Sequence, residues 1–540
     1  MSNYAKMIFQ DVPQSEPQFG KNQVINNAGG YVYKLDEWKM LDRFLILGSE
    51  SNTYYTSAKK LSLNNANNIM DLLAKDGKRF VDRVVEISDA GRAPKNDPAV
   101  FAMAIACAFG NDATKKYAYD NLSKVCRIGT HLFQFVDDVS KMRGWGRGLR
   151  TAVSNWYRNK DLSTLVYQLI KYKNRNGWSH KDVLRVAHPK PISQTQSALF
   201  SAVTRGFDLD LSFFVDPDCE RFYIASNIEK IANGSVDKVV ELIKEYNLPR
   251  EVVPTQMLNE PKVWMAMLED GMPLTAMIRN LGKMSSIGVL DPFSKAISIV
   301  TDALTNENFI RKSRVHPINI LNAKVTYNSG RGNRGSNTWK VNDMVNSALE
   351  DCFYLSFGNV TPSNKNTMIA LDVSGSMFGN YGGAYPMDNQ SLSAAEVSAA
   401  MAMVTIRTEP NYMVLGFSHK LEPININKNS SLQEVLNKMR NIPMGGTDCA
   451  LPMIYARKNK IPVEVFSVWT DNETWYGDVH PDAALRSFRK SMGIDAKLVV
   501  AGVTATEFTI ADPKDPGMLD VVGFDSAVPE LISEFARGNI

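Results

Sequence analysis

The first two thirds of the chain carry apolar residues at the spacing of amphipathic helices. Between residues 36 and 358 one such pattern follows another, each roughly 10 to 18 residues long, with caps or helix-breaking residues between them. Clear examples are LDEWKMLDRFLIL, KRFVDRVVEISDAG and SVDKVVELIKEYN. Because few strand patterns interrupt them and no strict repeat is detectable, the pattern favours a degenerate α-solenoid of helix pairs over a single compact bundle.

Beyond residue 366 the period of hydrophobicity changes. Helical patterns now alternate with five short apolar runs rich in β-branched residues, at 367–373, 412–418, 463–470, 496–504 and 519–524. This alternation predicts an α/β domain with a doubly wound, mostly parallel sheet. The polar, proline-containing stretch 359–366 is the expected boundary, so we expect a helical module of residues 1–360 and an α/β domain of residues 361–540.

The composition shows no pattern typical of disulfide-linked, secreted or membrane proteins. The five cysteines are scattered, without a CxxC pair, so we expect buried free thiols rather than a disulfide framework or a cysteine zinc site. The N-terminus has no apolar leader, and no run of about 18 apolar residues occurs. These features predict a soluble, intracellular protein that does not span a membrane.

The net charge of +4 conceals an uneven distribution. Residues 361–540 contain 15 Lys and Arg against 20 Asp and Glu, a net charge of −5, whereas residues 1–360 contain 46 against 37, a net charge of +9. Residues 124–190, called the basic segment below, hold 14 Lys and Arg but only 4 Asp and Glu. Such a concentration of positive charge indicates a polyanionic partner.

Oxygen-bearing side chains gather where predicted strands end. Asp372, Ser374 and Ser376 follow the first strand, Thr447 stands just before a helix, and Asp471 ends a later strand. Because ligands sit at the carboxyl ends of strands in such sheets, these loops should meet at one edge. Hydroxyl and carboxylate oxygens without His or Cys suit a hard cation such as Mg²⁺. The alternative is that Ser and Asp only cap the following helices.

This arrangement resembles the metal-ion-dependent adhesion site of von Willebrand factor A domains, whose DxSxS, Thr and Asp elements match the same five residues. The resemblance implies one divalent cation, Mg²⁺ or Mn²⁺, held by Asp372, Ser374, Ser376, Thr447 and Asp471. The glycine-containing insert 378–392 is expected to cover the metal and restrict an acidic side chain offered by a protein ligand. Asp448 and Glu473 flank the site and are expected as outer neighbours or surface residues.

Three stretches of the helical part resemble the TROVE module of the Ro family of ribonucleoproteins, in which the module also precedes an A domain. They are residues 176–191, 273–284 and 334–339. The resemblance implies HEAT-like repeats closed into a ring, Y RNA on the outer surface, and single-stranded ends of misfolded small RNAs in the hole. It also implies a monomer that acts in quality control of non-coding RNA, in the cytoplasm with a nuclear fraction.

The basic segment offers a physical reason for RNA binding. In WSHKDVLRVAH, Ser179 can cap a helix that buries Val183 and Leu184, while cations three and four residues apart share the opposite face. Cations at helix ends also suit the helix dipole, which is the structural alternative. Trp145 can stack on a base or belong to the core. The candidate RNA-binding residues are Arg127, His131, Lys141, Arg143, Arg147, Arg150, Lys171, Lys173, Arg175, His180, Lys181, Arg185, His188 and Lys190.

Two other classes of function compete with RNA binding. A Mg²⁺-dependent interaction scaffold of the adhesion type is the main alternative, although a secreted adhesion protein should show a signal sequence and disulfides. A metal-dependent nuclease usually gathers several carboxylates around two metals, which this motif does not. The chain also lacks a GxxxxGK[ST] phosphate loop. We therefore predict a binding protein without enzymatic activity.

Overall fold

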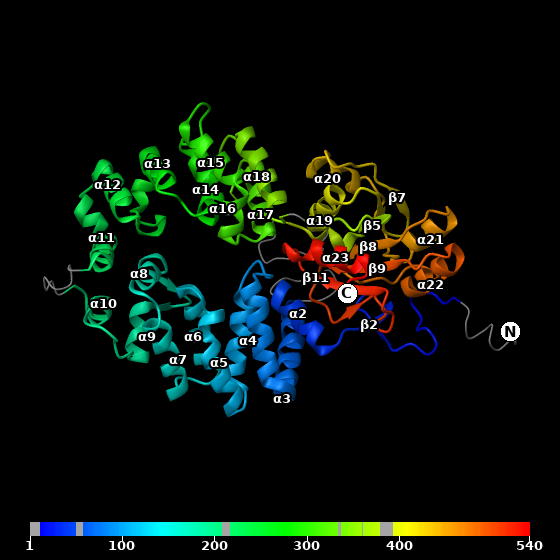
Figure 1. Ribbon diagram of the computed structural model, residues 1–540, viewed down its shortest axis with the longest axis horizontal. Helices are drawn as coiled ribbons and strands as arrows, with labels where there is room; N and C mark the ends of the chain where they lie inside the picture. The colour runs from blue at the N-terminus through cyan, green and yellow to red at the C-terminus, as the bar shows by residue number, and fades with distance from the viewer. Residues whose placement is uncertain (1–10, 50–57, 208–215, 333–335, 359, 379–391) are drawn as a thin grey trace.

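The structure is a computed structural model that describes residues 11–49, 58–207, 216–332, 336–358, 360–378 and 392–540. Figure 1 shows two parts side by side, a large array of helices and an α/β domain, with the N-terminal segment lying against the latter. This agrees with the predicted combination of a helical module and a doubly wound domain. None of the helices described here is both long and apolar enough to cross a membrane.

The helical module follows from the amphipathic patterns, and its helices begin where the sequence supplies caps. The Ser179 side chain, for example, accepts from the backbone N–H of Asp182, whose carboxylate accepts from that of Ser179. The helices are α2 (Glu37–Leu47), α3 (Ala58–Ala90), α4 (Asp97–Phe109), α5 (Asp112–Val125), α6 (Gly129–Met142), α7 (Arg147–Arg158), α8 (Leu162–Lys171), α9 (His180–Ala187), α10 (Gln194–Arg205), α11 (Pro217–Ala232), α12 (Val236–Tyr246), α13 (Pro261–Glu269), α14 (Leu274–Ser286), α15 (Lys295–Thr305), α16 (Glu307–Ser313), α17 (Pro317–Asn328) and α18 (Asp343–Leu355).

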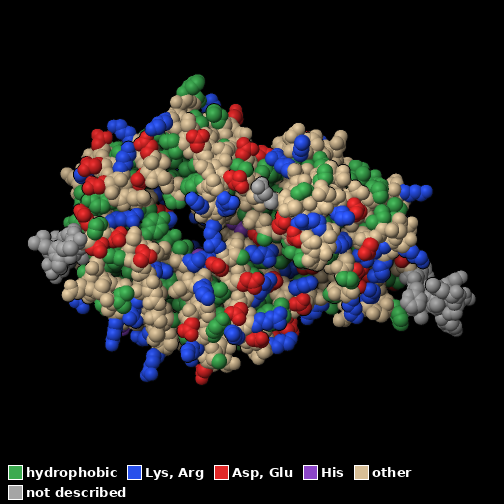
Figure 2. All heavy atoms as spheres, in the orientation of Figure 1, with side chains coloured by type: hydrophobic (Ala, Val, Ile, Leu, Met, Phe, Trp, Pro, Cys, Tyr) green, Lys and Arg blue, Asp and Glu red, His purple; other side chains and the backbone are tan. Residues whose placement is uncertain are grey.

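These helices form two facing rows, α2 to α10 and α11 to α18 (Figure 1), and Figure 2 shows a hollow between the rows. The rows touch at one end where α8 packs against α11. At the other end Arg314 donates to the backbone oxygen of Asp89, and Asn319 donates to that of Pro94 at 3.3 Å. The end of α3 and the loop after it are therefore in direct contact with the residues around α16 and α17.

The α/β domain is built on the predicted sheet. Its order is β11-β9-β8-β5-β6-β7, and every pair is parallel except β6 and β7. The five strands predicted from the sequence are confirmed, and most of their ends differ from the predicted ones by one or two residues. The strands are β5 (Thr367–Asp372), β6 (Tyr412–Phe417), β7 (Leu421–Pro423), β8 (Val465–Thr470), β9 (Lys497–Gly502) and β11 (Met518–Val522), and the helices are α19 (Ala394–Thr408), α20 (Leu432–Arg440), α21 (Leu451–Lys458), α22 (Pro481–Met492) and α23 (Ala527–Arg537).

The sheet is buried on both faces, as its continuous apolar runs require. Alternate residues of β5 enter different cores, because successive side chains of a strand point to opposite faces. Ile369 and Leu371 join the core beneath α19, α20 and α23, which is continuous with that of the helical module. Met368 and Ala370 join a second core beneath α21 and α22. The sheet edge that carries the candidate cation ligands is thus fixed from both sides.

The N-terminal segment lies on the α/β domain. From its position in the sequence we had counted it with the helical module. Strand β2 (Tyr31–Lys34) pairs antiparallel with β1 (Gln23–Ile25) on one side and with β10 (Phe508–Thr509) on the other. The two ends of the chain therefore share one small sheet. Strand patterns of three or four residues carry little periodicity, which is why the sequence did not indicate them.

Two arginines, one buried and one partly exposed, join the two parts. Arg43 of α2 is 1% exposed and donates to the Asp520 carboxylate of β11 at 2.6 Å. Arg92, between α3 and α4, donates to Asp525 at 3.2 Å and to the backbone oxygen of Val522 at 3.0 Å. The α/β domain is therefore attached to the first helices by ion pairs as well as by the shared core.

All five cysteines are buried and unpaired, which confirms the expectation of free thiols. Desolvation raises the pKa of each of the Cys126 and Cys449 thiols well above its ordinary value. They pack as small apolar side chains.

Candidate metal centre and basic surface

The end of β5 places the first three candidate ligands side by side. The Asp372 carboxylate accepts from the backbone N–H of Ser374 at 2.9 Å and from the Thr470 hydroxyl at 2.7 Å. The hydroxyl oxygens of Ser374 and Ser376 lie 3.0 Å apart. Asp372, Ser374 and Ser376 are all buried. Because the Asp and the two Ser residues of the DxSxS motif alternate along the chain, their oxygen-bearing side chains lie together in one small cluster.

The other two ligand loops meet this cluster. Asp471 follows β8, the strand that pairs with β5, and its carboxylate accepts from the backbone N–H of Glu473 at 3.0 Å. The nearby Ser376 hydroxyl acts to lower the pKa of this carboxylate, against the larger effect of burial. Thr447 precedes α21, and the Thr474 hydroxyl lies 3.1 Å from its backbone oxygen. The structure therefore brings together the loops of all five predicted ligands.

Two acidic side chains are buried together in this cluster. Burial, followed by the nearby charge of Asp471, raises the pKa of Asp372 to about 7, and burial also raises the pKa of Asp471. Two carboxylates buried together disfavour ionisation because each loses water and repels the other. A divalent cation between them would remove this penalty, so the electrostatics fit a cation.

The donor atoms also fit a cation. The Thr447 hydroxyl is buried and has no hydrogen-bond partner within the described part of the chain. A buried hydroxyl without a partner is costly, and a metal ion is one ligand that would satisfy it. Among the described residues no three His, Cys, Asp or Glu side chains are grouped to hold a metal. Any ion here therefore depends on the three hydroxyls, a set of hard donors that suits Mg²⁺ or Mn²⁺.

Sequence reasoning missed some of the surroundings of this site. The Thr470 hydroxyl holds Asp372, and its place immediately before Asp471 was the only signal for it. Asp448 and Glu473 are buried, so they are not surface residues. The insert 378–392, expected to cover the metal, lies almost wholly outside the described residues, which resume at Leu392.

The basic segment presents most of its predicted residues to solvent. Figure 2 shows Lys and Arg side chains projecting around α7 and α9 at the lower left. Three candidates are only partly exposed, namely Arg127, His131 and Lys171. The ten exposed candidates are Lys141, Arg143, Arg147, Arg150, Lys173, Arg175, Lys181, Arg185, His188 and Lys190. Their number on neighbouring helices makes a positively charged surface.

Some of these cations also have structural partners. Arg150 donates to the backbone oxygen of Val186 at 2.8 Å, and Arg185 donates to that of Thr204 at 2.9 Å. Both arginines donate to backbone oxygens near the C-terminal ends of helices, which is the structural role that the helix dipole favours for a cation. Arg175 pairs with Asp97 at 3.2 Å. Their guanidinium groups remain exposed, so these contacts orient the cations and leave donors free.

Two aromatic candidates are wholly or partly buried. His180 is buried, with Nδ1 2.8 Å from the Tyr157 hydroxyl and Nε2 3.2 Å from the Gln168 backbone oxygen. It is therefore not placed to touch RNA, and we leave it out of the RNA surface below. The Trp145 indole packs against Trp178 with ring centroids 6.0 Å apart, and its Nε1 is buried. Trp145 is partly buried and packs against the core, which is nearer to the core alternative than to an exposed stacking surface.

Three histidines that are largely shielded from water should make the stability of the protein depend on pH. Burial lowers the pKa values of His131, His180 and His316 to about 4, below the ordinary value of 6.5. Between pH 6.5 and 4 the unfolded chain binds more protons than the folded chain, so stability falls as the pH drops through this window. We expect a loss of about 1 kcal/mol per histidine between pH 7.5 and 5.5, measured by urea denaturation. His180→Gln should flatten this dependence, and an unchanged dependence would contradict the assignment.

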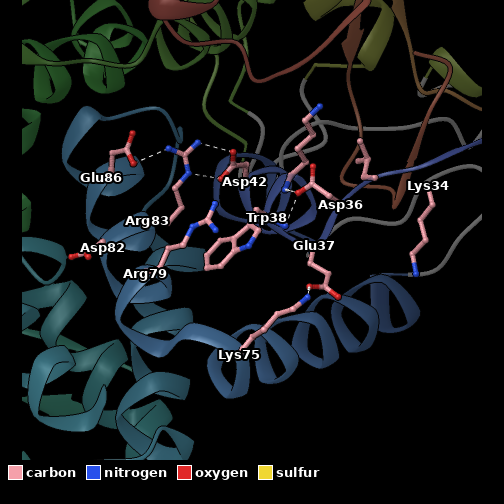
Figure 3. A pocket seen from close by; sticks show the side chains of 12 residues that line it. Lys34, Asp36, Glu37, Trp38, Asp42, Lys75, Arg79, Asp82, Arg83 and Glu86 are labelled. Atoms are coloured by element: carbon pink, nitrogen blue, oxygen red, sulfur yellow. Dashed lines mark hydrogen bonds and ion pairs between the residues drawn. The ribbon is translucent and has the colours of Figure 1, made fainter. Parts of the chain in front are cut away.

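Two surface pockets differ in their charge. A pocket of about 710 Å³ between α5 and α7 extends the basic surface, because its lining has more cations than carboxylates. The charged residues that line it are Lys115, Lys116, Arg143 and Arg147, with Asp112 and Asp120. A pocket of about 930 Å³ between α2 and α3 is lined by both signs of charge. Figure 3 shows that some of its cations are already engaged, since Lys75 pairs with Glu37 and the Arg79 guanidinium lies 4.0 Å from the centre of a Trp38 ring. Of these two pockets, the first has the more positive lining and suits a polyanion better.

Comparison with known proteins agrees with both parts of the fold. Residues 24–211 and 245–365 match the TROVE domain, and residues 366–536 match the Ro60 vWA domain. The RNA-binding protein RO60 of Deinococcus radiodurans is 39% identical over 98% of this chain and 98% of its own, and that of Caenorhabditis elegans is 35% identical over 98% and 92%.

A solved structure shows the same architecture. The crystal structure of the Deinococcus radiodurans RO (RSR) protein superposes with a TM-score of 0.71 at 36% identity, covering 94% of this chain and all of that one. The fold and the site define a TROVE-domain protein with a C-terminal von Willebrand factor A domain. This chain belongs to the Ro60 family.

Proposed function

We propose that this chain is the RNA-binding subunit of a small ribonucleoprotein, cytoplasmic with a nuclear fraction. Its helical module closes into a ring, a Y RNA binds the basic outer surface, and single-stranded ends of misfolded small RNAs enter the hole in RNA quality control. The observation that carries the proposal is the surface of ten exposed basic-segment residues on a TROVE domain. The contact of α3 and the loop after it with the residues around α16 and α17 supports the ring.

The electrostatic part of this proposal predicts a change in salt dependence. Lys173, Lys181 and Lys190 are exposed and lie in and between the neighbouring helices α8 to α10. Each phosphate contact to a duplex contributes about 0.9 to the slope of log K against log salt. Replacing all three by alanine should therefore make the slope shallower by up to about 2.7 for a Y-type hairpin RNA, measured by filter binding across a salt series.

A matched control separates this surface from general charge. Lys458, Lys460 and Lys490 are also exposed but lie on the α/β domain, and their replacement by alanine removes the same charge. We expect this control to leave affinity and slope near those of the wild type. Exposed lysines contribute little to stability, so both variants should fold. Equal effects of the two triple variants, or no effect of the first, would contradict RNA binding on the basic segment.

In the α/β domain, we propose that Asp372, Ser374, Ser376, Thr447 and Asp471 hold one divalent cation, Mg²⁺ or Mn²⁺, directly or through water. When bound, the cation supplies a position for an acidic side chain of a protein ligand. The buried carboxylates supply the charge, and Thr447 supplies an oxygen with no partner among the described residues. The proposal assigns the chain no reaction and a monomeric state, with RNA and the protein ligand on separate domains.

A further inference from the structure

The N-terminal segment reaches both loops beside the candidate cation site. Asn27 donates from its side-chain amide to the Glu473 carboxylate at 2.8 Å, and the backbone N–H of Ala28 donates to the same carboxylate at 3.1 Å. Glu473 in turn donates its backbone N–H to the carboxylate of Asp471 at 3.0 Å. Two bonds from the start of the chain thus fix the residue that orients a candidate ligand.

A second set of bonds reaches the loop of Thr447. The buried Gln14 donates from its side-chain amide to Asp448 at 2.6 Å and to the backbone oxygen of Val479 at 2.9 Å. The Gln14 amide oxygen also accepts from the Thr474 hydroxyl, which lies beside the backbone oxygen of Thr447. Gln14 therefore connects the loop after Thr447 with the loop after Asp471.

A tight turn holds the segment against these loops. The Asn26 side chain accepts from the backbone N–H of Gly30 at 2.8 Å and donates to the backbone oxygen of Thr474 at 2.7 Å. A Cβ atom on Gly30 would lie 1.9 Å from that same oxygen, so only glycine permits this approach. Residues 26–30 are therefore closely packed against the loop of Thr474 and held there by specific hydrogen bonds.

We propose that residues 14–30 act as positioning residues of the cation site. They hold Asp448 and Glu473, and through them the loops that present Thr447 and Asp471, in the geometry that binds the ion. Partners outside the coordination shell commonly determine metal affinity in this way, since they fix the orientation of the ligands. The inference rests on the proposed cation site and adds that the α/β domain alone does not complete it.

The experiment measures Mn²⁺ affinity of the full chain by electron paramagnetic resonance and by titration calorimetry. Asn27 is exposed, so Asn27→Ala removes one bond to Glu473 without opening the core. We expect Mn²⁺ to bind about tenfold more weakly, which is the lower end of the effect of such partners. The spectrum of the bound ion should also change, whereas the melting temperature without metal should stay near that of the wild type.

Tyr33→Phe is the matched control, because it removes a bond from the same segment to Asp482, a residue outside the ligand loops. Its Mn²⁺ affinity and spectrum should equal those of the wild type. If the wild type binds Mn²⁺ and Asn27→Ala binds it with equal affinity and spectrum, the inference is overturned. If the wild type binds no Mn²⁺, the proposed cation site itself is wrong, and the inference fails with it.

Discussion

Replacing Arg43 by alanine is expected to lower the free energy of unfolding by about 3 to 5 kcal/mol, the cost typical of removing one partner from a buried ion pair. The substitution leaves the Asp520 carboxylate, 4% exposed, without its cation. It also removes donors from the backbone oxygens of Thr506 and Phe508, which Arg43 reaches at 3.2 and 3.1 Å. Urea denaturation followed by circular dichroism measures the loss.

Arg83 provides the control for this prediction. It lies on α3 between Asp42 and Glu86 (Figure 3) and donates to Asp42 at 2.6 Å, as short a contact as that of Arg43. The Arg83 and Asp42 side chains are 29% and 19% exposed, so water can solvate what remains after Arg83→Ala. We expect a loss below about 1 kcal/mol. Similar losses for the two variants would show that burial does not set the energy of the Arg43 pair.

The sequence predicted those features that are encoded locally. The five strands of the α/β domain came from short apolar runs, and the DxSxS cluster came from alternation within five residues. Because parallel strands end at the same edge, Thr447 and Asp471 could also be placed near Asp372 without knowing the strand order. The exposure of Lys181, Arg185 and His188 on one side of α9 likewise follows from helical spacing.

Features that depend on distant contacts could not be predicted in this way. Asn27 and Glu473 are 446 residues apart, and neither belongs to a pattern that would pair them. The same holds for β2 and β10. His180 was counted with the basic residues, although it lies three and four residues before Val183 and Leu184 and therefore on the buried side of α9. Its burial depends on Tyr157 and on Gln168, which come from two other helices.

Asp372→Asn is expected to abolish stabilisation by Mn²⁺ or Mg²⁺. A ligand present at 100 times its dissociation constant stabilises the folded state by about 2.7 kcal/mol, which the wild type should gain and the variant should not. Asparagine keeps the shape of the side chain and an oxygen for the backbone N–H of Ser374, but it removes one of the two buried carboxylates. Thermal unfolding with the cation and with a chelator gives the difference directly.

Without the cation the same substitution should not destabilise the protein. Burial and the charge of Asp471 both oppose ionisation of Asp372, so removing its charge relieves a repulsion. In a chelator the variant should therefore unfold at the same temperature as the wild type or higher. Its affinity for hairpin RNA should be unchanged, because the cation site and the basic segment lie on different domains. A folded Asp372→Asn variant that binds RNA much more weakly would mean that the two sites are coupled. Arg43 would then be the first residue to test for this coupling, because it bonds Asp520 and the backbone oxygen of Thr506 across the two domains.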